Sequence, residues 1–144
     1  MRVYLDNCCF NRPFDDQKQL RIRLEAEAKL GVQETIMEGR IELAWSYILD
    51  FENAMNPFEQ RKMVIFRWRT HAAVHIHETQ GIREKAENLV QQGLKSKDAL
   101  HVACAIALEC DYFITTDDHL IKKSTGLKEI KVVDPITFVR EELE

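Results

Sequence analysis

The sequence predicts an α/β fold, built on a parallel β-sheet of about five strands with helices on both faces. Short β-prone segments alternate with helical segments along all 144 residues, and no repeat, linker or low-complexity segment interrupts them. The length is that of one domain that can bury most of its apolar surface. We therefore expect residues 1–144 to form a single domain.

The composition is that of an ordinary globular protein, with 45% hydrophobic and 31% charged residues. The chain begins with a strand-like segment instead of the charged and apolar regions of a signal peptide, so we expect a cytoplasmic protein. The four cysteines have neither zinc-site nor disulfide-framework spacing and are expected to be small buried hydrophobes. A net charge of -4 argues against a generally basic nucleic-acid surface, although bound cations would reverse the charge of a carboxylate cluster locally.

The first third of the chain is expected to contain two strands separated by one long helix. Arg2–Leu5 is a short β-prone run, and residues 7–16 are expected to form a loop. From about residue 16 to 38, apolar residues recur every fourth position, at Leu20, Leu24, Ala28, Val32 and Ile36. This spacing predicts an amphipathic helix with Gly39 just after its end. Residues 41–46 are expected to form the second strand.

The middle of the chain is expected to add three helices and one strand. The first helix starts at Tyr47, directly after the second strand. Asn56 is expected to cap the next helix, with Pro57 in its first turn. Residues 72–77 read as the third strand, and Thr79 is expected to cap the helix that follows it.

The last third contains the segment from Lys95 to Lys123, around which the chain is organised. A nearly all-apolar helix opens at Ser96 and leads into a short strand that ends at Thr115. Three further elements are expected, a short helix at residues 119–124, a strand at residues 130–133, and a final helix that starts at Asp134–Pro135.

Acidic residues fall where the predicted strands end. In a parallel sheet with right-handed crossovers, the carboxyl ends of all strands lie at one edge. Asp6 ends the first strand, Asp117 follows the fourth, and Asp98 stands in the first turn of a helix that begins at the same edge. A favourable contact with the helix dipole would explain Asp98 alone, but not its coincidence with the other two acids. We expect these three carboxylates to converge.

Glu52 is the fourth candidate, chosen by helical phase. Ile48, Phe51 and Met55 share one face of the helix after the second strand. Glu52 lies within that face, whereas Asp50 points away from it. An acid on an apolar face needs a partner or an ion, and a paired structural carboxylate is the alternative interpretation of Glu52.

Four carboxylates at one edge would repel one another and raise each other's pKa values unless a cation compensates. Carboxylate oxygens select Mg²⁺ or Mn²⁺ over zinc. Such ions bind phosphate oxygens, activate water and stabilise the charge on a leaving oxygen. The residues alone therefore predict Mg²⁺-dependent phosphate chemistry.

Histidines and basic residues elsewhere have open interpretations. His75 and His77 share a strand face, but with no third ligand nearby in sequence they are more simply surface or core histidines. His101 follows Asp98 by one helical turn and either supports a ligand or packs in the core. A basic cluster around Trp68 is most simply a solvated helix face, with nucleic-acid or partner binding as the alternative. Its members are Arg61, Lys62, Arg67 and Arg69.

At these residues the chain resembles the PIN domain family, which includes the ribonuclease toxins of VapC-type toxin–antitoxin modules. Four segments carry the resemblance, namely VYLDN, SYILDFEN, KDALHVACAIALECDYFITTDDHLI and VVDP. The resemblance implies a three-layer α/β/α fold and a metal-dependent endonuclease that hydrolyses phosphodiester bonds of single-stranded RNA. By motif position, Asp6, Glu52, Asp98 and Asp117 would be catalytic and would hold one or two Mg²⁺ or Mn²⁺ ions. Thr115 would be the supporting hydroxyl of the family's Thr-x-Asp.

Two departures from the family pattern concern supporting residues. Asn7 stands where the family often has Thr or Ser, and its amide can still hydrogen-bond a carboxylate or phosphate. Asp118 adds a fifth acid, which is either a supporting residue of the site or the N-cap of the short helix, and we favour the cap. The resemblance also implies single-stranded RNA and an antitoxin protein as partners, and a homodimer.

Two other function classes are alternatives to the nuclease. A catalytically weak module of the same fold would bind RNA or protein, but the acid set here is complete. A receiver-like phosphoacceptor would carry an acidic pair after the first strand and a Lys at a later strand end. Here the pair, Asp117 and Asp118, follows the fourth strand and no such Lys is present.

Overall fold

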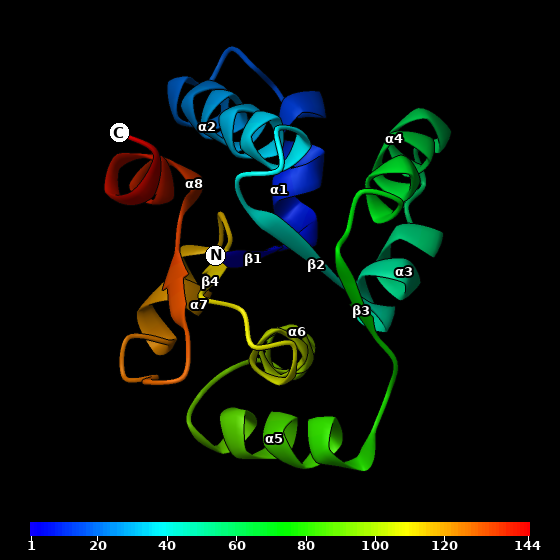
Figure 1. Cartoon of the computed structure of the whole chain (residues 1–144), viewed down its shortest axis with the longest axis vertical. Coiled ribbons are helices and arrows are strands. Elements are labelled where there is room, and N and C mark those ends of the chain that lie inside the picture. The colour runs from blue at the N-terminus through cyan, green and yellow to red at the C-terminus, as the bar shows by residue number, and fades with distance from the viewer.

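A five-stranded parallel sheet runs through the centre of the computed structural model, which describes all residues from 1 to 144 (Figure 1). The strands are β1 (Arg2–Leu5), β2 (Glu42–Ser46), β3 (Val74–Ile76), β4 (Tyr112–Ile114) and β5 (Lys131–Val133). They lie in the order β3-β2-β1-β4-β5, and every neighbouring pair is parallel. The predicted α/β class with a parallel sheet of about five strands is confirmed.

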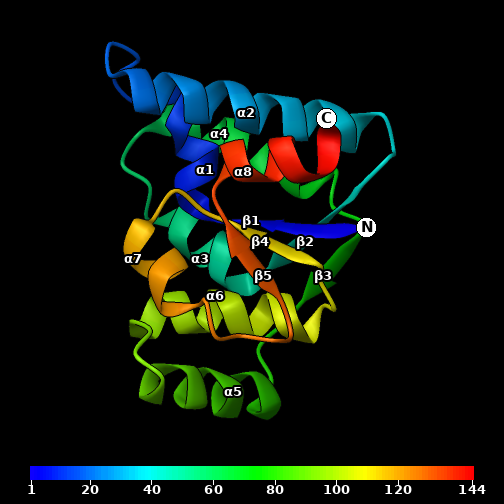
Figure 2. The same ribbon diagram turned by 90° about the vertical axis from the view of Figure 1, so that its left-hand side faces the viewer.

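Helices cover both faces of the sheet, which makes a three-layer arrangement (Figure 2). One face carries α1 (Asn7–Asn11), α2 (Leu20–Met37) and α8 (Pro135–Phe138), and the other carries α6 (Ser96–Ala107) with α5 (Gln80–Gln91) packed outside it. The remaining helices are α3 (Tyr47–Ala54) and α4 (Glu59–Arg69), which lie on the β3 side, and α7 (Asp118–Lys123), which contacts β5. None of the helices has both the length and the hydropathy needed to cross a bilayer.

The central strand β1 is buried over its last three residues. Its residues Val3, Tyr4 and Leu5 are fully shielded from solvent, as expected for a parallel strand covered on both faces. In the register, Leu5 pairs with Ile114 of β4, and Tyr4 pairs with Ala44 of β2. The chain therefore leaves β1, β2 and β4 at the same edge of the sheet, which we call the carboxyl edge.

Several predicted helix boundaries are confirmed. The Thr79 hydroxyl accepts a hydrogen bond from the Ile82 N–H at 3.1 Å and caps α5. Gly39 follows α2 with φ of +76°, and Gly93 follows α5 with φ of +109°. Both glycines adopt the left-handed conformation that a side chain would strain, which explains why these helices end there.

Two local predictions are wrong. Residues 7–11 form α1, followed by a 3-10 turn at Arg12–Phe14, where we expected a loop. The short helix forms because Asp6 caps it and because Cys9 and Phe10 are buried beneath it. Asn56 does not cap α4, which begins at Glu59; its side-chain oxygen instead accepts from the Phe58 N–H and closes a turn before the helix.

The predicted apolar face of α2 is wrong in its first half. Leu20 and Leu24 are exposed, and only the later members of the series, such as Val32 and Ile36, are buried. Glu25 and Lys29 occupy the buried side at the start of the helix instead. Ion pairing allows Glu25 to be buried, so the four-residue apolar repeat did not identify the packed face.

Candidate metal centre

Asp6 lies at the carboxyl edge immediately after β1 and is 8% exposed. Its N–H donates to the Ile114 carbonyl at 2.9 Å, which extends the pairing of β1 with β4 by one residue. The Thr115 hydroxyl donates to its carboxylate at 2.8 Å, and the Asn7 N–H donates to the other oxygen at 2.8 Å. These two donors fix the orientation of the Asp6 carboxylate.

Asp117 is joined to Asp6 through Thr115. The Asp117 N–H donates to the Thr115 hydroxyl at 3.1 Å, and this hydroxyl in turn donates to Asp6. The Asp117 carboxylate caps α7 by accepting from the N–H groups of His119 and Leu120 at 3.0 and 3.2 Å. The Thr115 hydroxyl therefore links the Asp6 carboxylate to the backbone of Asp117.

Our preference for Asp118 as the cap of α7 is wrong, because Asp117 has the extended backbone of an N-cap and Asp118 is the first helical residue. Asp118 is exposed and forms a two-point ion pair with Arg21 of α2, at 2.6 and 2.8 Å. The hydrogen bond from Arg21 lowers the pKa of the Asp118 carboxyl. Its contact is thus with a basic residue and not with the other acids.

Glu52 lies beside His101, which projects from α6 one turn after Asp98. The ring Nε2 of His101 and the Oε1 of Glu52 form a hydrogen bond. Burial by itself raises the pKa of Glu52, but the hydrogen bond and charge of His101, with a contribution from Lys97, hold it below its ordinary value. Glu52 therefore has a partner, yet one that is a ring nitrogen and not a permanent cation.

The predicted apolar face of the helix that carries Glu52 is wrong. Phe51 and Met55 are 59% and 72% exposed, and the buried side of α3 is formed by Ile48, Leu49 and Asn53. The helix lies on the β3 side of the sheet, so only a narrow face is covered. Glu52 borders that face, which explains why it contacts the interior although its apolar neighbours do not.

Asp98 stands in the first turn of α6 and is half-buried. Burial raises its pKa, and the negative charges of Asp6 and Asp117 raise it further, while His101 and Lys95 oppose the shift. No Lys or Arg forms an ion pair with Asp6, Asp98 or Asp117. The negative charges of Asp6 and Asp117 therefore act on Asp98, and no paired cation neutralises these three acids.

The tightest group of possible ligand atoms consists of Asp6, Glu52 and His101, whose ligand atoms all lie within 4.8 Å of one another. Asp98 and Asp117 are outside this trio, but the charges of Asp6 and Asp117 raise the pKa of Asp98. Carboxylate oxygens with a ring nitrogen nearby suit a hard divalent cation such as Mg²⁺ or, with nitrogen among the ligands, Mn²⁺. The residues present therefore fit a divalent metal.

Sequence reasoning missed two contributors to this centre. The Cys8 thiol lies 3.5 Å from the Asp6 carboxylate and 3.4 Å from the Thr115 hydroxyl. The Tyr4 hydroxyl lies 2.6 Å from the Nδ1 of His101, whose role had been left open. Asp98 and His101 are three residues apart on one helix, and this spacing indicates that they lie on the same face.

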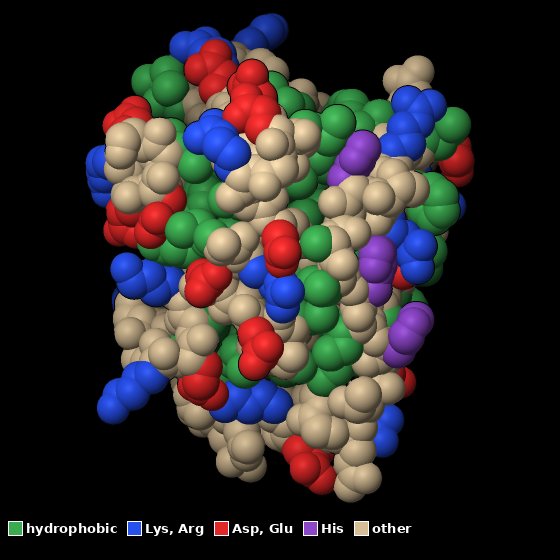
Figure 3. Space-filling model, viewed as in Figure 1, with side chains coloured by type: hydrophobic (Ala, Val, Ile, Leu, Met, Phe, Trp, Pro, Cys, Tyr) green, Lys and Arg blue, Asp and Glu red, His purple; other side chains and the backbone are tan.

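The other histidines do not join this centre. His75 is exposed on β3 and His77 is exposed just after it, and the Nε2 of His75 lies 3.2 Å from the Arg69 carbonyl. Figure 3 shows histidines at the surface on the β3 side, and acidic and basic side chains interspersed over this face without a single basic field. The simpler interpretation of these two histidines is confirmed.

No protein-family profile matches the sequence, and no curated protein matches it. Solved structures do resemble the fold. FitAcB from Neisseria gonorrhoeae aligns with a TM-score of 0.62 and 14% identity over 92% of this chain and 97% of that chain. A toxin–antitoxin complex from Klebsiella pneumoniae gives a TM-score of 0.59 and 20% identity with the same coverage.

VapBC-1 from nontypeable Haemophilus influenzae gives a TM-score of 0.59 and 17% identity, over 94% of this chain and 98% of that chain. Each likeness covers more than nine-tenths of both chains. The fold is therefore shared over nearly the whole chain.

Proposed function

We propose that this chain, whose α/β fold is that of PIN domains, is a divalent-metal-dependent nuclease that hydrolyses phosphodiester bonds of single-stranded RNA. The observation that carries the proposal is the grouping of Asp6 and Glu52 at the carboxyl edge, with Asp117 linked to Asp6 through Thr115 and with the charges of both Asp6 and Asp117 acting on Asp98. Unpaired acids in one field are costly in a folded protein unless a bound cation compensates them.

In this proposal Asp6, Glu52, Asp98 and Asp117 hold one or two Mg²⁺ or Mn²⁺ ions. A bound ion of this kind supplies Lewis-acid stabilisation of the phosphate and a water of lowered pKa. Thr115 keeps the Asp6 carboxylate in place and ties it to the start of α7. Asn7 adds an amide beside the site, with a buried side-chain oxygen that has no partner within the protein. Such an amide is suited to orient a phosphate or a water.

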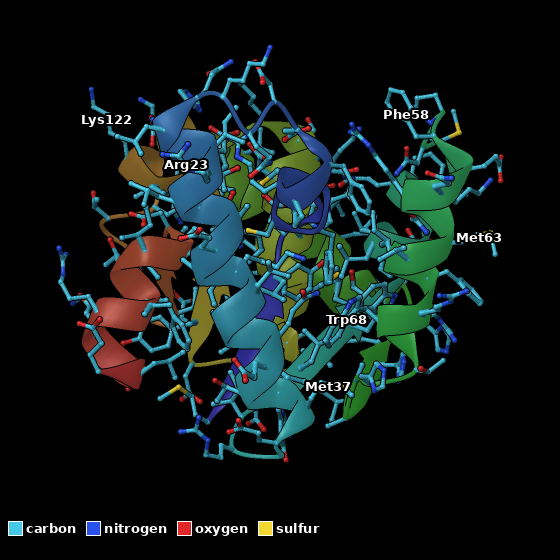
Figure 4. All side chains as sticks on the ribbon, turned by 90° about the horizontal axis from the view of Figure 1, so that it is seen from above. Arg23, Met37, Phe58, Met63, Trp68 and Lys122 are labelled. Carbon is cyan, nitrogen blue, oxygen red and sulfur yellow. The ribbon has the colours of Figure 1, made fainter.

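A protein partner, of the antitoxin kind, is the second part of the proposal. A groove of about 580 Å³ between α3 and α4 is lined by Met63 and Phe66 together with Lys62, Arg67 and Arg69. Five large apolar side chains of α3, of α4 and of the segment between them are exposed, namely Phe51, Met55, Phe58, Met63 and Phe66. Figure 4 shows Met63 on the outward side of α4, Phe58 at the start of that helix, and Trp68 facing the body of the protein. A monomer rarely exposes such a patch.

Two of the exposed apolar side chains, Met55 and Phe58, also lie near the acidic centre. A smaller cavity of about 270 Å³ is shared by Asn7 and Glu52 on one side and by Met55 and Phe58 on the other. A chain seated on α3 and α4 would therefore pass beside Glu52. This arrangement supports a partner that covers the site, as in a toxin–antitoxin module, and it equally supports a homodimer through the same patch.

The patch also favours one alternative function, a module of this fold that binds RNA or protein with little turnover. An RNA cleavage assay distinguishes this binding module from the nuclease. The natural setting for either function is the cytoplasm, as the sequence led us to expect.

The experiment is cleavage of a single-stranded RNA with Mg²⁺ or Mn²⁺ by the wild-type protein, by Asp98→Asn and by Asp111→Asn. Asp111 is an exposed acid at the opposite end of β4, where it accepts from the Arg2 N–H, and it serves as the matched control. We expect metal-dependent cleavage by the wild type and the control and none by Asp98→Asn. Unchanged cleavage by Asp98→Asn would refute the proposal, and metal binding without cleavage by the wild type would favour the binding module.

A further inference from the structure

We propose that His101 is a positioning residue that holds Glu52 for metal binding, and that Tyr4 and Ser46 orient its ring through a buried hydrogen-bond chain. The inference rests on the proposed function, because it concerns how the metal ligands are held. It adds three residues that no motif of the sequence assigned to the site. His101 and Ser46 are 1% exposed and Tyr4 is fully buried.

Both ring nitrogens of His101 have partners. Nε2 bonds Glu52, and Nδ1 lies 2.6 Å from the Tyr4 hydroxyl, which itself lies 2.6 Å from the Ser46 hydroxyl. The chain thus joins α6, β1 and β2 to the carboxylate of α3. Its inner end is deep in the sheet, and only its outer end reaches the carboxyl edge.

The donors and acceptors along this chain have one consistent direction when the ring is neutral. The Ser46 oxygen accepts the Leu49 N–H at 3.3 Å as the cap of α3, so its own hydrogen is free to go to Tyr4. Tyr4 then donates to Nδ1, which leaves the ring hydrogen on Nε2. A carboxylate only accepts, so Nε2–H donates to Glu52. In a charged ring both nitrogens donate, so the buried chain presents Nε2–H to Glu52 in either protonation state.

Packing keeps the ring in this orientation. The Tyr4 ring stacks on Phe113, with centroids 5.0 Å apart and an interplanar angle of 12°. It meets the His101 ring edge-on at 5.7 Å and 71°. Glu52, by contrast, lies at the border of the buried side of a short helix, where Phe51 and Met55 are exposed. A donor held by the rigid core thus removes rotamer freedom from a ligand that its own helix leaves loosely packed.

The alternative is that His101 binds the metal directly through Nε2. Its ligand atom is close enough to those of Asp6 and Glu52 to do so. That role would require Nε2 to leave Glu52 and Nδ1 to carry the hydrogen. Pulsed EPR of bound Mn²⁺ distinguishes the two roles, because a direct imidazole ligand gives a strong nitrogen coupling and a positioning residue does not.

The test compares His101→Gln with His101→Asn by calorimetric Mn²⁺ titration. The Gln amide reaches about as far from the backbone as Nε2 and can still donate to Glu52, whereas the Asn amide reaches only the position of Nδ1. We expect His101→Asn to weaken Mn²⁺ binding about 10- to 100-fold, the usual effect of losing a partner of a metal ligand, and His101→Gln to restore most of that loss. Thermal unfolding of both metal-free variants reports whether they fold.

Tyr4→Phe provides a second variant that keeps the stacking and removes only the hydroxyl. Its matched control is Tyr112→Phe in β4, whose hydroxyl binds Glu141 and Glu142. We expect Tyr4→Phe to weaken Mn²⁺ binding and the control to leave it unchanged. Equal affinity in all four variants, an equal loss in His101→Gln and His101→Asn, or a strong nitrogen coupling would overturn the inference. Absence of Mn²⁺ binding by the wild type would instead contradict the proposed function itself.

Discussion

Acidic side chains gather in two regions of this protein, at the carboxyl edge of the sheet and around the start of α2, and their partners differ. Near α2, Glu25 is 1% exposed, but Arg12 donates to one of its oxygens at 3.1 Å and Arg21 approaches the other at 3.5 Å. At the carboxyl edge, Asp6 is nearly as buried and its donors are neutral groups of Thr115 and Asn7.

Asp117 and Asp118 are adjacent in sequence but belong to different regions. Asp118 pairs with Arg21 and belongs to the α2 region, whereas Asp117 caps α7 and contributes to the field at Asp98. Neighbouring acids of the same type thus have opposite electrostatic environments. The carboxyl edge therefore differs from the α2 region in having acids that lie near one another, at least partly shielded from solvent, with no paired Lys or Arg.

The largest expected effect is that of Asp6→Asn on metal binding. Asn retains the cap of α1, so the fold is kept, but the central negative charge of the site is lost. We expect Mn²⁺ affinity to fall by more than about 100-fold, beyond the range for partners of metal ligands. EPR of the free Mn²⁺ signal measures it. Wild-type affinity in this variant would show that the carboxyl edge does not differ from the α2 region in the way we describe.

The next effect is on stability and belongs to the other region. Glu25→Gln should lower the free energy of unfolding by about 1.5–3 kcal/mol, because Arg12 and Arg21 lose the charge they share. Urea denaturation measures this change. Mn²⁺ affinity should stay at the wild-type value, and a change of under about 0.5 kcal/mol would mean that the buried ion pairs do not support Glu25.

A smaller effect of opposite sign is expected at Asp98. Its pKa is raised in the folded protein, so its ionised form costs stability at neutral pH. Asp98→Asn should therefore stabilise the metal-free protein, on the order of 0.5 kcal/mol because half-exposed charges are screened. The gain is full above the raised pKa and vanishes as the pH falls below the ordinary value of 3.8. Denaturation between pH 3 and 8 tests this, and a constant or negative difference would contradict it.

The smallest effect is expected for Asp118→Asn. Its ion pair with Arg21 is exposed, and many such pairs contribute nothing measurable at physiological ionic strength. Stability and Mn²⁺ affinity should both stay at wild-type values in denaturation and titration. A clear loss of metal affinity would restore Asp118 as a supporting residue of the site and remove the boundary drawn between it and Asp117.

The parts of this arrangement that follow from local patterns could be predicted from the sequence. Asp6, Asp98 and Asp117 stand at ends of strands and helices, and those ends are marked by changes in hydrophobic periodicity. The rest depends on tertiary packing. Helix α1 is five residues long and exists because of burial, and Phe51 is exposed because α3 lies on the β3 side of the sheet. His101 and Glu52 lie on different helices and are 49 residues apart in sequence, so no local pattern predicts their contact.

The most direct test of the central claim is a calorimetric Mn²⁺ titration of the wild type, Asp98→Asn and Glu25→Gln under one set of conditions. We predict saturable binding by the wild type and by Glu25→Gln, and none by Asp98→Asn, because Asp98 lies among acids that have no paired cation whereas Glu25 is paired with Arg12 and Arg21. Absence of saturable binding by the wild type, or equal binding by all three proteins, would contradict the account.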